Sequence, residues 1–218
     1  MPSRLPLFPL KVVLFPGTPL PLRIFEPRYR QLLADCLQGD QRFGITPMPR
    51  PGPGAVGCVA HIRATHQLPD GRYNIVVLGE QRFTVLALLD TNAPYLIASV
   101  ERFEDLPGTE PSPTERAELE HLANRYREAM ALLTDTPSDR AAWDEDPAAF
   151  SFQVAALLEA PLEVKEQLLA QRSTRERTRA LIALMPGLLR NVAERAQVHV
   201  RARSNGAGGS HPDIVSGL

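Results

Sequence analysis

Lysine is nearly absent from this chain, which has 218 residues and 24 basic side chains. Only Lys11 and Lys165 are lysines, and all the other basic residues are arginines. A P-loop needs the pattern G-x-x-x-x-G-K followed by serine or threonine, because its lysine must reach the nucleotide phosphates. Neither lysine follows a glycine. The sequence therefore excludes nucleotide binding through a P-loop.

Cysteines and long apolar runs are also scarce. Cys36 and Cys58 are the only cysteines, too few for a disulfide framework, so we expect a reducing compartment. The longest segments without a charged residue include 51–62 and 147–158, each of twelve residues, whereas a helix that spans a bilayer needs about 18 or more. The N-terminus is interrupted by prolines and lacks a small-residue cleavage site, which argues against a signal peptide. We therefore expect a cytoplasmic protein without a membrane segment.

Neither sign of charge is in excess, since 24 basic residues face 25 acidic ones and the net charge is −1. Such a balance argues against a protein whose main ligand is a phosphate backbone, so nucleic acid is not the expected partner. The neutrality is a cancellation along the chain. Residues 1–100 carry +4, residues 101–166 carry −10 and residues 167–218 carry +5.

Proline divides the chain. Eleven of the 21 prolines lie in residues 1–53, where they disfavour long helices and suit short strands and turns. A Pro-Asp-Gly turn at 69–71 separates two strand-like runs and predicts a hairpin. We predict a β subdomain over 1–104. One helix is expected within it, over about 27–38, because apolar residues recur there at helical spacing before Gly39.

The second half reads as helical. Residues 105–113 form an acidic linker, and Ser112–Glu115 supplies a capping box that opens a helical subdomain over 114–200. A second capping box lies at 173–176, and Pro186 is expected to end or kink the helix that follows it. The glycine-containing tail, 201–218, is predicted to be disordered.

Metal and catalytic sites are not predicted. On a regular strand Cys58 and His66 point to one face and His61 to the other, so these side chains do not converge on a metal. No G-x-S-x-G nucleophile elbow is present. Lys165 lies beside Glu163 and is expected in an ordinary exposed ion pair with Glu163 or Glu166. We therefore predict no enzyme activity and no cofactor. A solvated helix face is the expected role of Arg172, Arg175, Arg177 and Arg179.

The densest unusual cluster is the segment 22–30, with the sequence LRIFEPRYR. Three arginines, one glutamate and two aromatics stand there at the junction between a strand and a helix. Two interpretations apply: the cluster binds a peptide or an anion, or Glu26 caps the helix and pairs with Arg23 or Arg28. The residues alone favour the structural interpretation.

Three specific segments open the chain, Leu5–Leu10, Leu14–Gly17 and Leu20–Tyr29. Further distinctive segments lie at Phe43–Ile45, Val56–Ala60, Asp70–Tyr73, Gly79–Phe83, Ser151–Ala155 and Lys165–Leu169. In combination these segments resemble the N-terminal, substrate-binding domain of the Lon ATP-dependent proteases. The resemblance covers nearly everything before the tail.

The resemblance implies an α+β fold, in which a PUA-like twisted β pseudo-barrel with one inserted helix precedes an α-helical bundle. This agrees with the division that the prolines and capping boxes predict. Full-length members of the family join this domain to an AAA+ ATPase and a Ser-Lys protease. The chain ends before either, so we expect a stand-alone protein to which neither activity is carried over.

The leading hypothesis from the resemblance is a non-catalytic polypeptide-binding or adaptor module. Its expected partners are unfolded or client polypeptides and a Lon-type protease. The expected groove lies near the strand-to-helix junction, where aromatic rings supply apolar surface and arginines orient acidic or carbonyl groups. The residues assigned to it are Phe15, Arg23, Phe25, Glu26, Arg28 and Tyr29.

Two other functions stay open. PUA-like barrels of other families bind RNA, and residues 1–100 are net positive, although the acidic middle segment opposes RNA binding. A small-molecule-binding enzyme that uses the mouth of the barrel is the third interpretation.

Overall fold

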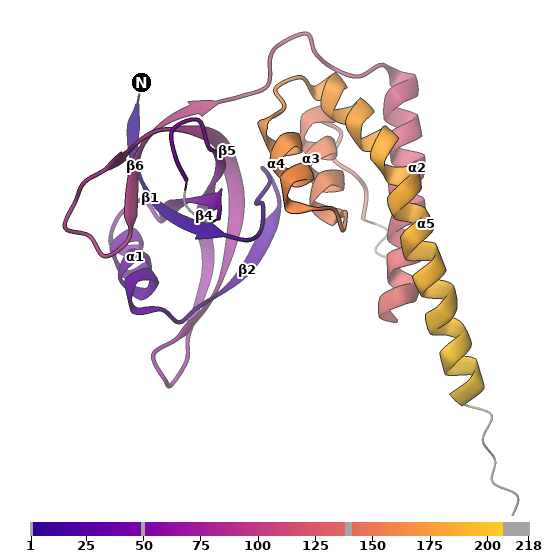
Figure 1. Cartoon of the computed structure of the whole chain (residues 1–218), viewed down its shortest axis with the longest axis horizontal. Helices are drawn as coiled ribbons and strands as arrows, with labels where there is room; N and C mark the ends of the chain where they lie inside the picture. The colour runs from indigo at the N-terminus through magenta and orange to yellow at the C-terminus, as the bar shows by residue number, and fades with distance from the viewer. Residues whose placement is uncertain (1, 49–50, 138–140, 207–218) are drawn as a thin grey trace, which may run out of the picture.

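The computed structural model describes residues 2–48, 51–137 and 141–206, which form a β-barrel followed by a group of helices (Figure 1). The strands are β1 (Ser3–Leu10), β2 (Pro19–Ile24), β3 (Arg42–Pro47), β4 (Val56–Gln67), β5 (Tyr73–Leu89) and β6 (Leu96–Phe103). The helices are α1 (Pro27–Gln38), α2 (Pro113–Thr134), α3 (Pro147–Leu157), α4 (Leu162–Ala170) and α5 (Thr174–Gly206). Within these ranges no helix has an apolar stretch long enough to cross a membrane.

The sheet closes on itself because β6 pairs with both β1 and β5. The ring runs β1–β3–β4–β5–β6 and returns to β1, while β2 lies beside the first half of β5. Only β1 and β3 pair in parallel. Register shifts in β4 and β5 mark bulges that bend these long strands around the barrel. The predicted α+β fold, a twisted pseudo-barrel with one inserted helix and a following helical group, is confirmed.

α1 begins and ends where its apolar spacing predicts. Proline occupies its first position, and the Gly39 N–H donates to the Cys36 carbonyl at its end. Its buried stripe consists of Tyr29, Leu32, Leu33 and Cys36. This stripe shares one continuous core with Phe8 of β1, so the inserted helix packs against the outside of the barrel wall (Figure 1).

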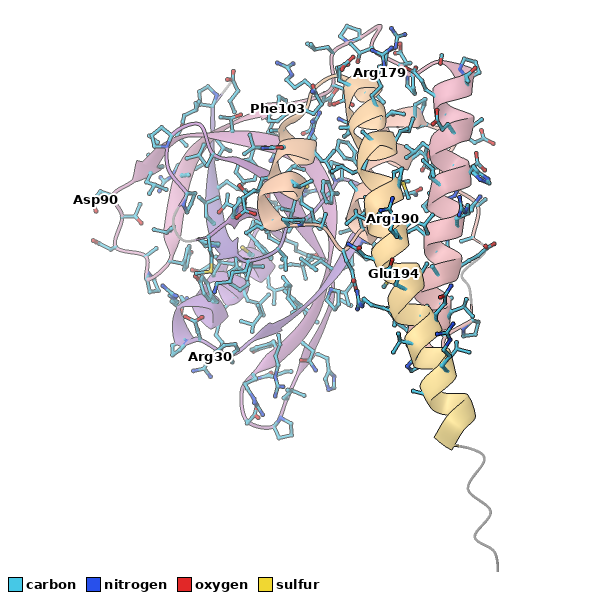
Figure 2. The ribbon with its side chains drawn as sticks, turned by 45° about the vertical axis from the view of Figure 1, so that its right-hand side comes forward. Arg30, Asp90, Phe103, Arg179, Arg190 and Glu194 are labelled. Carbon is cyan, nitrogen blue, oxygen red and sulfur yellow. The ribbon has the colours of Figure 1, made fainter. Side chains whose placement is uncertain are left out.

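α2 and α5 are long helices that run side by side in the same direction (Figure 1). Near their N-termini, Arg179 Nε lies 2.6 Å from Glu115 Oε1, and near the far end of α2 His199 Nε2 lies 2.9 Å from Asp135 Oδ2. Figure 2 shows Arg179 at the start of α5, level with the start of α2. α3 and α4 lie between this pair and the barrel (Figure 1).

The expected end of the helix at Pro186 was wrong, because α5 is continuous from Thr174 to Gly206, and the alternative, a kink, stays a prediction. The buried residues of α5 keep helical spacing on both sides of the proline: Leu181, Met185, Leu189, Val192 and Ala196. Packing along α2 therefore outweighs the one backbone hydrogen bond that a proline removes. The helix also extends past Arg201, where the disordered tail was predicted to begin. The rest of that predicted tail, 207–218, lies outside the described residues.

A buried ion network joins the barrel to the helices. Asp105, just after β6, accepts hydrogen bonds from Arg82 of β5 and from Arg177 of α5. The Thr174 hydroxyl donates to the same carboxylate at 2.7 Å. The side chains of Arg82 and Arg177 are 3% and 0% exposed. One carboxylate thus ties together a strand, the segment after the sheet and the last helix.

Backbone carbonyls and a hydroxyl satisfy further donors of the two guanidinium groups. Arg82 Nη1 donates to the carbonyls of Leu169 and Gln171, at 2.9 and 2.8 Å. Arg177 Nη1 donates to the Gln171 carbonyl at 2.7 Å, and Arg177 Nε donates to the Ser151 hydroxyl at 2.7 Å. These bonds involve α3 and the end of α4, so the network holds every element that lies between the barrel and α5.

The expected solvated face of arginines at 172–179, just before and within the start of α5, was wrong at one position. Arg172, Arg175 and Arg179 are exposed, but Arg177 is fully buried, with its guanidinium carbon 3.9 Å from the ring centre of Phe152. Buried arginines need charged and hydrogen-bonding partners that lie far away in sequence. Local spacing does not reveal those partners, so the sequence pattern did not single out Arg177.

Asp105→Asn is expected to lower the free energy of unfolding by about 3–5 kcal/mol, because two buried guanidinium groups lose the one carboxylate that pairs with them in the described part of the chain. Urea unfolding followed by circular dichroism measures the change. Glu110→Gln, an exposed site in the same connecting segment, is the matched control, with a change within about 0.5 kcal/mol. Equal free energies of unfolding for the two variants would show that the ion network does not stabilise the fold.

The same variant gives a pH test. Burial opposes ionisation of Asp105, but hydrogen bonds from Arg177 and Thr174 and the nearby positive charges outweigh it and lower the pKa of the carboxyl. A lowered folded-state pKa stabilises the fold above the unfolded value of about 3.9 and loses that contribution as pH falls below it. The stability difference between wild type and Asp105→Asn should therefore shrink below about pH 4.

Candidate functional site

The predicted strand-to-helix junction presents one exposed aromatic ring. Phe25 lies between β2 and α1 and its side chain is 61% exposed. Arg23 and Arg28 are exposed beside it in sequence. Arg28 Nε donates to Glu26 Oε2 at 2.9 Å, whereas the Glu26 side chain makes no capping hydrogen bond to the helix. The structural interpretation is therefore correct in one part and wrong in the other: Arg28 pairs with Glu26, but the Glu26 side chain does not cap the helix. We call Arg23, Phe25, Glu26 and Arg28 the junction surface.

The other two aromatic residues assigned to this site lie in the core. Tyr29 is 8% exposed, and its ring centre lies 4.1 Å from that of Phe8. Phe15 is 0% exposed and its ring lies 6.1 Å from Phe152 of α3. Neither ring offers surface to a partner in this conformation. The structure therefore gathers four of the six assigned residues at the junction surface and places Phe15 between the barrel and α3.

β2 pairs with β5 along one side only. The Thr18 carbonyl accepts a hydrogen bond from the Gly79 N–H at 3.0 Å, and alternate residues of an antiparallel strand face the same neighbour. The outward positions are therefore Pro19, Pro21 and Arg23. Two of these three lack an N–H donor, so the edge is a poor template for an added strand. A partner at β2 must be recognised mainly through side chains.

Three adjoining hollows form one furrow between α3 and the turn that precedes β2. The first and second hollows share Gly17, and the second and third share Thr18, Pro19, Ala156 and Leu157. Their volumes are about 350, 420 and 420 Å³, each within the usual range for ligand pockets. We call this feature the α3 furrow.

α3 gives the furrow its apolar wall. The helix has the sequence PAAFSFQVAAL, without any charged residue, and a helix that is apolar on every side leaves apolar surface wherever it is not covered. Its large residues Phe150, Phe152 and Val154 are buried. The half-buried residues that face the furrow are mostly small: Ala148, Ala149, Gln153, Ala156 and Leu157.

Close backbone packing fixes the opposite wall. A Cβ atom on Gly79 would lie 2.1 Å from the Phe15 carbonyl oxygen, so only glycine allows β5 to approach the turn this closely. Gly17 N–H donates to the Gly79 carbonyl at 2.9 Å, and the Thr18 hydroxyl donates to the Phe15 carbonyl at 2.8 Å. The furrow thus has one rigid wall from the barrel and one from α3.

The two ends of the furrow differ in charge. Glu80, Glu104 and Asp146 line one end, near the buried network. Phe103 also lines that end, and Figure 2 shows it on the side of the barrel that faces the helices. Lys11 and Lys165 line the other end. The furrow therefore has carboxylates along one end and the two lysines of the chain at the other.

The expected surface ion pair of Lys165 was wrong. Its Nζ donates to the Ala156 carbonyl at 3.3 Å, and the side chain is half-buried beside the furrow. Burial lowers the pKa of its ammonium group, partly offset by the charge of Glu159. The two neighbouring glutamates suggested an exposed ion pair for Lys165, but its side chain points toward α3 instead.

The cysteine and histidine residues do not form a reactive centre in the described part of the chain. Burial raises the pKa of the Cys36 and Cys58 thiols to about 12, so neither is a thiolate nucleophile near neutral pH. His61 Nδ1 lies 2.8 Å from Glu80 Oε1, and Arg42 pairs with the same carboxylate. Among the described residues, no group of three or more potential ligands is placed to hold a metal ion.

Comparison with known proteins identifies the family of the chain. Residues 4–186 match the family described as the ATP-dependent protease La (LON) substrate-binding domain. Lon protease of Anaeromyxobacter dehalogenans is 29% identical over 197 residues, 85% of this chain and 23% of that protein. Lon protease of Methylocella silvestris is 30% identical over 176 residues, 76% of this chain and 21% of that protein. The chain thus spans less than a quarter of these relatives.

Two solved structures have the same fold. The crystal structure of the Lon N-terminal domain protein from Xanthomonas campestris aligns with a TM-score of 0.67 and 28% identity, over 84% of this chain and 99% of that one. The N-terminal domain of Lon protease from the Mycobacterium avium complex aligns with a TM-score of 0.61 and 20% identity, over 83% of this chain and 97% of that one. At that identity the second likeness supports the fold alone.

Stability measurements separate the buried aromatic residues from the exposed one. Phe15→Ala is expected to lower the free energy of unfolding by about 3–5 kcal/mol, because it opens a cavity against Phe152. Phe25→Ala should change it by no more than about 0.5 kcal/mol, since its ring lies in solvent. Urea denaturation of both variants checks this; a large loss of stability in Phe25→Ala would show that its ring is part of the core.

Proposed function

The chain belongs to the family of LON substrate-binding domains, and from this membership we propose that it is a polypeptide-binding module that recruits client chains without catalysis of its own. The family match over residues 4–186 carries the proposal, since it includes both the barrel and the start of α5. The proposed clients are unfolded polypeptides with exposed apolar segments. A Lon-type protease is the proposed recipient of those clients.

The shape and chemistry of the α3 furrow support polypeptide binding. Its three hollows adjoin one another, and apolar residues line most of its middle and its lysine end. An extended apolar segment gains free energy there by removing its own side chains and the furrow surface from water. Because β2 lacks outward donors at two positions, we place recognition on side chains rather than on an added strand.

The junction surface is the second proposed contact. Phe25 is the only exposed phenylalanine or tyrosine among the described residues, and exposed aromatics flanked by arginine are frequent in binding surfaces. Arg23 and Arg28 supply donors for carboxylates or carbonyls of a client. Phe15 and Tyr29 support the two surfaces from the core.

We do not assign to this chain the protease activity that the names of its relatives state. The chain spans less than a quarter of those proteins, so the activity of the whole relatives is not assigned to it. The two thiols are protonated near neutral pH for the reason given above. Recruitment rather than peptide-bond cleavage is therefore the activity proposed for this chain.

A larger side chain in the wall of the α3 furrow tests whether clients bind there. Ala156→Gln places a larger, uncharged, helix-compatible side chain in the furrow wall, and Ala183→Gln makes the same change on an exposed site of α5. We expect Ala156→Gln to weaken binding of a permanently unfolded, dye-labelled protein about tenfold, because the client loses apolar contact. Fluorescence anisotropy measures the affinity, and Ala183→Gln should bind like wild type.

The junction surface is tested separately with Phe25→Ala in the same titration. A loss of about threefold to tenfold is expected if its ring contacts the client. If Phe25→Ala binds the unfolded protein as tightly as wild type does, the junction surface is not a contact. If Ala156→Gln and Phe25→Ala both bind it as tightly as wild type does, the proposed binding site as a whole is contradicted. Salt-sensitive binding of single-stranded RNA without any binding of unfolded protein would favour the RNA-binding alternative.

A further inference from the structure

The two lysines of the chain, far apart in sequence, line the same hollow at one end of the α3 furrow. Lys11 follows β1, and Lys165 lies in α4. The hollow is otherwise mainly apolar, with a floor that includes Val13, Leu14, Leu20, Leu157 and Leu162. Two lysine residues therefore line a mainly apolar space of about 420 Å³, which is large enough for side chains of a bound segment.

The positive charge of this end is not neutralised within its lining. Glu159 is the only acidic residue that lines it, and the Glu159 carboxylate accepts from Arg195 Nη1 of α5 at 2.5 Å. Lys165 donates to one carbonyl, that of Ala156, whereas an ammonium group has three donors. A ligand that complements this end carries a negative charge next to apolar groups.

α4 lies at the lysine end of the furrow, which we call the closed end. Leu162 and Lys165 of α4 line the furrow, whereas Glu163 and Glu166 of the same helix line a separate hollow that shares no residue with it. A polypeptide that lies along α3 therefore meets α4 at this end. At the other end the lining is acidic, as described above. The N-terminal turn of α4 also favours an anion at the closed end through its helix dipole.

We propose that the closed end of the α3 furrow binds the C-terminal carboxylate of an apolar client polypeptide, with Lys11 and Lys165 as its donors. The inference rests on the proposed function, because it assigns a chemical class of ligand and a direction to the same furrow. A chain terminus places its charge at the last residue, where α4 ends the space, and leaves the preceding apolar side chains along α3. A carboxylate on a side chain within the segment would require the backbone to continue through α4.

The test uses short dye-labelled peptides of alanine, leucine and valine that differ only at the C-terminus, one with a free carboxylate and one with an amide. A third peptide has the amide and one internal aspartate. With the wild-type protein we expect the free acid to bind about tenfold more tightly than the amide, because charge-assisted hydrogen bonds to the carboxylate are lost. The aspartate peptide should bind like the amide.

Variants assign the effect to the two lysines. Lys11→Gln/Lys165→Gln should bind the acid and the amide equally, while Lys11→Arg/Lys165→Arg keeps the charge and should retain most of the preference. The control is Arg63→Gln/Arg190→Gln, which removes two exposed positive charges from sites outside the furrow, one of them on α5 (Figure 2). It should preserve the preference for the acid.

The outcomes separate this inference from the proposed function. Equal binding of acid and amide by the wild-type protein overturns the carboxylate site and leaves polypeptide binding standing. Tight binding of the internal aspartate peptide overturns the assignment to a chain terminus. Failure of all three peptides and of the unfolded protein to bind overturns the proposed function, and this inference with it.

Discussion

The carboxylate of Asp105 is the contact on which the rest of the structure depends. It neutralises one of two guanidinium groups that are almost completely removed from water, and removal of charge from water is costly unless partners replace the solvent. Besides Asp105, those partners come from α3, the end of α4 and the start of α5. Aromatic rings add to them, since Arg82 and Arg177 both lie over Phe152. The network therefore fixes where the helices stand relative to the barrel.

The α3 furrow is a consequence of that placement. One wall belongs to the barrel and the other to α3, so its width is set by whatever holds α3 against the barrel. Phe152 serves both purposes, because one α3 side chain packs on Phe15 and beneath the two arginines. α3 buries Phe150 and Phe152 and leaves half-buried alanines toward the furrow. One short helix thus contributes both to the apolar surface of the furrow and to the surroundings of the buried ion network.

Local signals predicted the elements, and long-range contacts decided the site. The apolar spacing and flanking proline and glycine gave α1 its correct bounds. That spacing also placed Tyr29 on the buried stripe of the helix, a signal against its assignment to a surface. The uncharged run 147–158 signalled α3 as apolar on every side. The burial of Arg177 and the presence of Lys11 and Lys165 in one hollow had no local signal, because both depend on elements distant in sequence. The subdomain boundaries at 104 and 114 stay a prediction, which we keep as a proposal.

The central claim is that a client segment lies in the α3 furrow with its C-terminus toward α4. A client peptide with a photoactivatable group at its last residue tests this directly, by crosslinking followed by mass spectrometry. The account predicts crosslinks to the segment 11–14 and to the segment 157–165, which line the closed end. Crosslinks confined to α2 or to the outer half of α5 would contradict it.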